Sequence, residues 1–108
     1  PGALEIAPAI KLVLDKSLKK RIFDGYVALG CIIKGETYHF EIVANESSRA
    51  ITDLSLNYSI PIGNGILTVS NKDQAIIRSD PKQLNKGADA ALACLSLINI
   101  KKNSINYE

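Results

Sequence analysis

The chain has 108 residues, with 13 Lys or Arg, 11 Asp or Glu and a net charge of +2 at neutral pH. Apolar residues make up 46% and charged residues 22%, a globular composition that argues against disorder, collagen and coiled coil. The length fits one domain over residues 1–108, and the small net charge argues against nucleic acid as a partner. We interpret the basic cluster of Lys16, Lys19, Lys20 and Arg21 as the solvated C-terminal end of a helix.

No segment predicts a membrane span or a secretory signal. The longest uncharged run, residues 54–71, is interrupted by Pro61, Gly63 and Gly65, and the chain does not open on a basic and then an apolar segment. Cys31 and Cys94 lie far apart in apolar surroundings without CxxC spacing. We therefore expect buried, reduced thiols in a cytoplasmic protein, and neither a disulfide nor a metal site.

The spacing of apolar residues predicts alternating helices and strands. Helical spacing runs from Ile6 to Leu14 and fades around residues 19–21. Residues 26–33 are apolar and partly β-branched, which predicts a strand buried on both faces of a parallel sheet. Residues 34–37 break the strand, and helical spacing resumes at Tyr38 and continues to Tyr58.

A second strand is predicted at residues 62–69, which contain two glycines. Asn71 can cap a short helix that ends near Arg78. After residues 85–87, small and apolar residues from Ala88 to Ile98 predict a last helix rich in alanine. Its small side chains allow close packing against a helix or the sheet.

This alternation predicts an α/β fold of three layers, with a parallel sheet and helices on both faces. Two strands are too few for such a sheet, so we expect a further strand, either upstream of Pro1 or from a neighbouring chain. The chain starts at Pro1 and contains no methionine. Removal of an initiator methionine before proline is one explanation, and we expect instead that an N-terminal part is missing. Ligands of such sheets bind beyond the carboxyl ends of the strands, here residues 34–39 and the turn after Val69.

The segment after the first strand has the glycine spacing of a phosphate-binding loop. Gly30 and Gly35 enclose four residues, but Glu36 stands where a nucleotide-hydrolysing loop has lysine, and a carboxylate repels a triphosphate. Gly35, the Thr37 hydroxyl and the free N–H groups of the next helix could still hold one phosphate. The alternative is that Gly35 only makes the turn and Thr37 only caps the helix.

Three basic residues are candidates on chemical grounds. His39, the only histidine, falls in a first helical turn, where the helix dipole favours a neutral imidazole that can accept and return a proton. Arg78 and Lys86 can bind phosphate. The alternatives are a surface or capping histidine and ordinary exposed cations at helix ends. The pattern indicates neither hydrolase nor metal chemistry.

Four stretches resemble the lumazine synthase family, which acts in riboflavin biosynthesis. They are PGALEI (residues 1–6), ALGCIIKGETYHF (28–40), VANE (43–46) and NKGADAA (85–91), in the family's order and spacing. The family carries a strand, a helix and a strand upstream of its PGA segment. The resemblance thus implies a flavodoxin-like sheet whose first part is absent from this chain.

The resemblance implies a transferase that condenses 5-amino-6-(D-ribitylamino)uracil with 3,4-dihydroxy-2-butanone 4-phosphate. The products are 6,7-dimethyl-8-ribityllumazine, phosphate and water, and no cofactor or metal takes part. The amine attacks the ketone to form an imine, phosphate is eliminated, and the ring closes with loss of water. Catalysis would then depend on proximity and proton transfer.

The resemblance also assigns residues to the site. His39 is the proton-transfer residue, and the phosphate group would be bound by Glu36, Thr37, Arg78 and Lys86. The ribitylaminouracil would be contacted by Ala3, Leu4, Glu5, Cys31, Ile32, Ile33 and Asn64. The family often has an aromatic residue at the position of Asn64, whose amide could instead pair with the uracil edge.

Finally, the resemblance implies a homo-oligomer, a pentamer or a multiple of pentamers, with active sites between subunits. One chain would contribute residues 3–39, and the next would contribute Asn64, Arg78 and Lys86. Riboflavin synthase is a candidate partner. Two alternatives remain open: a non-catalytic relative that binds flavin or lumazine or forms a shell, which Asn64 favours, and a nucleotide-binding α/β domain.

Overall fold

The computed structural model describes residues 1–16 and 22–104. Its elements are η1 (Ala3–Glu5), α1 (Ile6–Lys16), β1 (Tyr26–Ile33), α2 (His39–Tyr58), β2 (Ile62–Val69), α3 (Lys72–Ser79) and α4 (Lys86–Ser104). The predicted helices and strands are confirmed, whereas the single turn η1 was too short to show a period. Within the described ranges, none of these helices is both long and apolar enough to cross a membrane.

The basic cluster is seen only in part. Lys16 is exposed in the last turn of α1, as expected for a cation at a helix C-terminus. Lys19, Lys20 and Arg21 lie outside the described residues.

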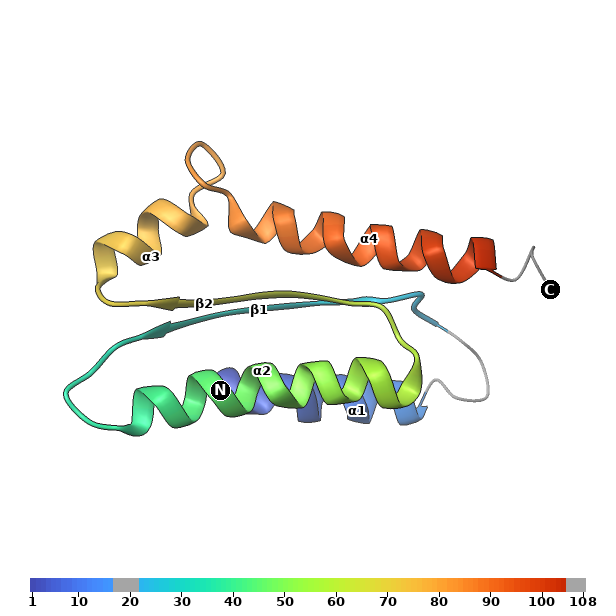
Figure 1. The fold of residues 1–108 in the computed structure, drawn as a ribbon, viewed down its shortest axis with the longest axis horizontal. Helices are drawn as coiled ribbons and strands as arrows, with labels where there is room; N and C mark the ends of the chain where they lie inside the picture. The colour runs from blue at the N-terminus through green and yellow to red at the C-terminus, as the bar shows by residue number, and fades with distance from the viewer. Residues whose placement is uncertain (17–21, 105–108) are drawn as a thin grey trace.

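β1 and β2 form a parallel sheet between two helical layers (Figure 1). Tyr26 pairs with Ile62 and Ile33 with Val69, so the two strands begin and end together. α1 and α2 cover one face, and α3 and α4 lie over the other. A parallel pair requires a long crossover, which α2 provides. The predicted α/β fold with helices on both faces of a parallel sheet is confirmed.

The hydrophobic core lies between the sheet and the layer formed by α1 and α2. Its buried members are Ala7, Ile10, Leu14, Ala28, Ile51, Leu54, Ile60 and Ile62. Side chains of a strand alternate between its two faces, so Ala28 and Ile32 are buried on this side of β1.

The prediction that β1 is buried on both faces is wrong. Leu29, on the face opposite the core, is 60% exposed, and Val27 and Ile33 are exposed as well. The reason is the position of α4, which contacts β2 far more than β1. An apolar run therefore identified the strand correctly but not what covers its second face.

α4 approaches β2 closely enough to require glycine. A Cβ added at Gly63 would lie 1.9 Å from the carbonyl oxygen of Ala90, and one added at Gly65 would lie 3.0 Å from the Ala90 Cβ. Ala90 and Cys94 are the buried residues of this helix. This contact confirms the close packing predicted from the alanine-rich sequence of α4.

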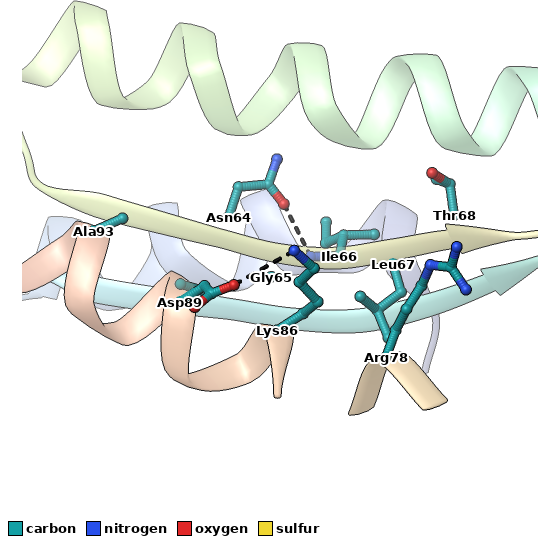
Figure 2. Close-up of a pocket in the computed structure, with 10 residues that line it drawn as sticks. Asn64, Gly65, Ile66, Leu67, Thr68, Arg78, Lys86, Asp89 and Ala93 are labelled. Carbon is teal, nitrogen blue, oxygen red and sulfur yellow. Dashed lines mark hydrogen bonds and ion pairs between the residues drawn. The ribbon is translucent and has the colours of Figure 1, made fainter. Parts of the chain in front are cut away.

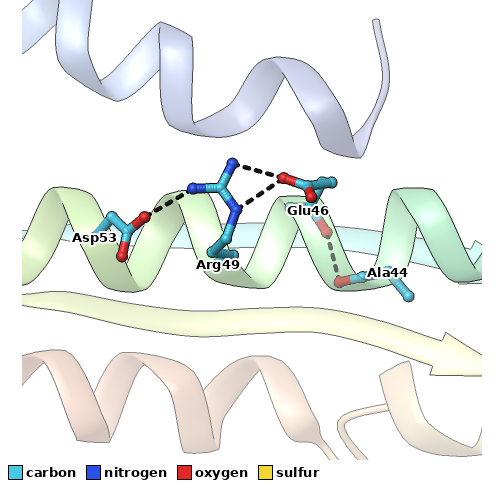
Figure 3. A network of polar contacts seen from close by, with 5 residues as sticks. Ala44, Glu46, Arg49 and Asp53 are labelled. Atoms are coloured by element: carbon cyan, nitrogen blue, oxygen red, sulfur yellow. Dashed lines mark hydrogen bonds and ion pairs between the residues drawn. The ribbon is translucent and has the colours of Figure 1, made fainter.

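α2 also carries an exposed charge network (Figure 3). Arg49 Nε donates to Glu46 Oε2 at 2.8 Å and Nη1 donates to Asp53 Oδ2 at 2.8 Å, three residues before and four after it. Both carboxylates raise the pKa of Arg49, with Glu46 the larger cause. These pairs support the helix locally, since residues three and four apart are neighbours on its surface.

We expect Gly63→Ala to destabilise the protein by about 1–3 kcal/mol or more, because the new methyl group cannot fit beside the Ala90 carbonyl. Urea unfolding measures the change. Gly35→Ala is the matched control, because nothing lies within 4 Å of a Cβ added there. An unfolding midpoint for Gly63→Ala equal to that of the control would contradict the close packing of α4.

Candidate functional site

Two hollows flank the sheet, one along each strand. The β1 hollow, of about 500 Å³, is lined by Pro1, Gly2, Ala3, Glu5, Ile6, Ala9, Leu29, Gly30 and Cys31. The β2 hollow, of about 390 Å³, is lined by Asn64, Gly65, Ile66, Leu67, Thr68, Arg78, Lys86, Asp89, Ala90 and Ala93. Each includes successive residues of one strand, and the strands pair with each other. The hollows therefore lie at the two outer edges of the sheet.

The β1 hollow brings together three predicted site residues, Ala3, Glu5 and Cys31. Glu5 Oε1 accepts a hydrogen bond from the Gly2 N–H at 3.0 Å, which fixes the carboxylate beside η1. A Cβ at Gly30 would lie 3.2 Å from Ile6 Cδ1, so the glycine allows α1 to begin close to the strand. The resulting hollow is lined mainly by apolar residues and by one carboxylate, that of Glu5.

Cys31 corrects the prediction of two buried thiols. It is exposed and free, whereas Cys94 is buried and free, as predicted. Cys31 shares the face of β1 that carries Leu29, which α4 leaves uncovered, so its thiol reaches the hollow. Its apolar neighbours in the sequence did not reveal this.

The segment between β1 and α2 lies at the carboxyl end of the sheet. The Lys34 N–H donates to the Val69 carbonyl at 2.8 Å, which holds the start of this segment against the end of β2. Glu36, Thr37 and His39 are all exposed. None of the three lines the β1 or the β2 hollow.

His39 is the first residue of α2, so its predicted place in a first helical turn is confirmed. The N-cap residue is Tyr38, and no side chain caps this helix, so the alternative in which Thr37 caps it is wrong. The first helical hydrogen bonds are donated by the N–H groups of Glu41 and Ile42 to the Tyr38 carbonyl. The N–H groups of His39 and Phe40 precede this ladder and point out of the helix end.

The β2 hollow brings together Asn64 from β2, Arg78 from α3 and Lys86 from α4 (Figure 2). Arg78 is half-buried, and its Nη1 donates to the Gln74 carbonyl at 3.4 Å. Lys86 Nζ lies 3.5 Å from Asp89 Oδ2. Two cations and one carboxylate thus line this hollow, a balance that suits an anionic group.

Asp89 also lines this hollow, although it was not among the predicted site residues. It follows Lys86 by three residues on the same helix, and this spacing places two side chains on one face. The signal was therefore present in the sequence once Lys86 had been selected.

Asn64 is oriented by the strand itself. Its Oδ1 accepts a hydrogen bond from the Ile66 N–H at 3.0 Å, whereas its amide nitrogen points away from the strand (Figure 2). The Pro61 carbonyl accepts from the Tyr26 N–H of β1 and the Val69 carbonyl from the Lys34 N–H just after β1. The even-numbered residues of β2 therefore direct their N–H groups to the outer edge. Gly63 and Gly65 face α4, so the Asn64 side chain lies on the opposite face of β2, and its amide nitrogen does not point toward Arg78 or Lys86 (Figure 2).

A tight turn sets the spacing between Arg78 and Lys86. Asp80 accepts hydrogen bonds from the Lys82 N–H at 2.9 Å and from Gln83 Nε2 at 3.1 Å, and these bonds lower the pKa of its carboxyl. The Asn85 N–H donates to the Asp80 carbonyl at 3.1 Å, and Asn85 adopts a φ of 48°. The left-handed residue reverses the chain so that α4 begins beside the end of α3.

The predicted site residues therefore fall into separate places. Leu4 and Ile33 are exposed outside both hollows, and Ile32 is buried, so only its backbone is available to a ligand. A single chain does not gather the predicted residues into one cavity within the described ranges. Among the same residues, no three His, Cys, Asp or Glu side chains lie together as a metal site.

Known proteins are similar to this chain over most of its length. The family model for 6,7-dimethyl-8-ribityllumazine synthase matches residues 1–102. The protein of that name from Zymomonas mobilis is 55% identical over 102 residues, which cover 94% of this chain and 70% of the relative. Those from Bartonella henselae and Agrobacterium fabrum are 56% and 54% identical, over 94% of this chain and 64% and 70% of the relatives. The chain thus spans about two thirds of the length of these relatives.

We expect iodoacetamide to label Cys31 in the folded protein and Cys94 only after unfolding, because only the Cys31 thiol is exposed. Peptide mapping by mass spectrometry distinguishes the two sites. The Cys31→Ser variant should take up no label while folded. Labelling of Cys94 before Cys31 would contradict the placement of β1 relative to α4.

Proposed function

Because this chain belongs to the 6,7-dimethyl-8-ribityllumazine synthase family, we propose that it is a transferase of riboflavin biosynthesis. It condenses 5-amino-6-(D-ribitylamino)uracil with 3,4-dihydroxy-2-butanone 4-phosphate to form 6,7-dimethyl-8-ribityllumazine. The observation that carries this proposal is the convergence of Arg78 and Lys86 in the β2 hollow of a chain so similar to relatives of that name.

The β1 hollow is the proposed place of the ribitylaminouracil. Glu5 has one carboxylate oxygen engaged with Gly2, which leaves the other to accept hydrogen bonds from ribityl hydroxyls. Ala3, Leu4 and Cys31 flank the ligand, and Ile32 and Ile33 contribute at the end of β1, Ile32 through its backbone.

The β2 hollow and the segment after β1 are the proposed place of the phosphate group. Arg78 offers two parallel donors and Lys86 a point charge. Thr37 adds a hydroxyl, and the free N–H groups at the start of α2 suit an anion. Glu36 is tolerated because its exposed side chain can point to solvent.

The placement of the two hollows supports an active site shared between chains. They lie at opposite edges of one sheet, so the Arg78 and Lys86 of one chain would meet the β1 hollow of another. Exposed apolar side chains such as Leu29, Leu92 and Leu95 suit burial in such an assembly. We propose a pentamer or a multiple of pentamers, with riboflavin synthase as a candidate partner and the cytoplasm, which keeps thiols reduced, as its location.

His39 is the proposed proton carrier. Imine formation requires a proton to leave the attacking amine, and loss of water requires one to reach the departing oxygen. An imidazole at the exposed start of α2 can perform both transfers near neutral pH. The remaining acceleration comes from holding the two substrates in contact.

One assay with two readouts tests the proposal. Both substrates are added to the full-length protein, the absorbance of the lumazine product is followed, and light scattering gives the mass in solution. Product from a multiple of five chains supports the enzyme. The same assembly without turnover would instead support a non-catalytic binding or shell-forming relative, an alternative motivated by Asn64 at a position where the family often has an aromatic residue. Tight binding of magnesium–ATP would support the nucleotide-binding alternative.

We expect His39→Ala to lower kcat by roughly 10- to 10⁴-fold, because it removes the proposed proton carrier and water replaces it only in part. Steady-state kinetics with both substrates measure the loss. An unchanged kcat would remove His39 from the mechanism.

We expect Arg78→Ala to weaken binding of the phosphate-bearing substrate by about 1.5–3 kcal/mol, the usual contribution of a charge-assisted hydrogen bond. The KM of each substrate, measured with the other saturating, separates the two. Equal weakening of both substrates would count against a phosphate-binding role.

A further inference from the structure

We propose that Asn71 and Gln74 are positioning residues that hold Arg78 over the β2 hollow and thereby set its affinity for a phosphate group. The inference rests on the proposed function of this hollow. It assigns a role to two side chains that do not line the hollow themselves.

Burial does little to fix the helix that carries Arg78. α3 has eight residues, none of them buried, and its apolar side chains Ile76 and Ile77 are 49% and 41% exposed. Isolated helices of this length are marginal in water. Hydrogen bonds at the ends of α3 therefore contribute to holding its orientation alongside its limited packing on β2 and α4.

Two side-chain hydrogen bonds hold the N-terminal end of α3. Asn71, the N-cap residue, accepts from the Gln74 N–H through its Oδ1 at 2.9 Å. The Gln74 side chain reaches back, and its Oε1 accepts from the Ser70 N–H at 2.7 Å. This arrangement resembles a capping box shifted by one residue. It ties the first turn of α3 to the residue that follows β2.

The same glutamine contacts the arginine. Arg78 lies one turn after Gln74, and its Nη1 donates to the Gln74 carbonyl at 3.4 Å. Gln74 is therefore capped through its N–H, bonded to the end of β2 through its side chain, and bonded to Arg78 through its carbonyl. Fraying of the first turn of α3 displaces the Gln74 carbonyl, which accepts the hydrogen bond from the Arg78 guanidinium.

A frayed first turn leaves Arg78 present but poorly placed. Phosphate binding must then order the helix as well as the ligand. This cost weakens the affinity for phosphate and leaves the affinity for ribitylaminouracil unchanged. We expect the loss of either capping side chain to weaken phosphate binding by about fivefold, which corresponds to about 1 kcal/mol, the typical contribution of a helix N-cap.

The test titrates inorganic phosphate into full-length protein and measures the KM of both substrates. Gln74→Ala and Asn71→Ala should raise the Kd of phosphate and the KM of the phosphate-bearing substrate about fivefold, and leave the KM of ribitylaminouracil unchanged. Asn71→Asp keeps an acceptor for the Gln74 N–H and should retain phosphate affinity. Ser79→Ala is the matched control, because it loses one hydrogen bond, from its Oγ to the Ile76 carbonyl, at the other end of α3 and lies outside the hollow.

Arg78→Ala serves as the reference. If it weakens phosphate binding while Gln74→Ala and Asn71→Ala do not, the positioning role is overturned and the proposed function stands. If Arg78→Ala leaves phosphate binding unchanged, the proposed phosphate site fails and the positioning role fails with it. Equal weakening of both substrates, or loss of the folded state, in the two alanine variants would show a general structural role and would also overturn the proposal.

Discussion

The parallel pairing of β1 with β2 is the constraint on which the rest of the structure depends. Because the two strands are in register and run the same way, their carboxyl ends meet, and the segment before His39 lies beside the turn before α3. Among the described residues, each strand pairs with the other along one edge, and a hollow lies along its other edge. The distribution of the candidate residues, Glu5 and Cys31 on one side and Arg78 and Lys86 on the other, follows from this pairing.

The contact between α4 and β2 places Lys86 at the same edge of the sheet as Arg78. Gly63 and Gly65 remove two side chains from β2, and Ala90 keeps the facing surface of α4 small. The helix therefore lies almost against the strand backbone. Lys86 and Asp89, in the first turn of α4, are brought to the outer edge of β2 by this close approach.

The order of the α-helices and strands and the bounds of the two strands could be predicted from the sequence because periodicity is a local property, whereas α4 extends beyond the predicted residues at both ends. Tyr26–Ile33 and Ile62–Val69 are short apolar runs bounded by turn residues, and α1 and α2 show an apolar stripe. Exposure could not be predicted in the same way. Leu29 and Cys31 look like core residues in sequence, but their burial depends on whether a distant helix covers them. The candidate site shows the same division: the chemistry of Arg78 and Lys86 and the spacing of Asp89 from Lys86 are visible in the sequence, whereas the capping role of Gln74 needed the folded chain. The roles of His39, Glu36 and Thr37 remain predictions.

The outer edge of β2 has a consequence for how molecules of this protein behave towards one another. An unpaired strand edge is a template on which a second strand can add, and this is how many proteins begin to aggregate. Here the Ile66 N–H is taken by the Asn64 side chain and the Ser70 N–H by the Gln74 side chain. An incoming strand would have to break both bonds before it could form its own. Two amide side chains thus make this edge a poor template for unwanted sheet extension.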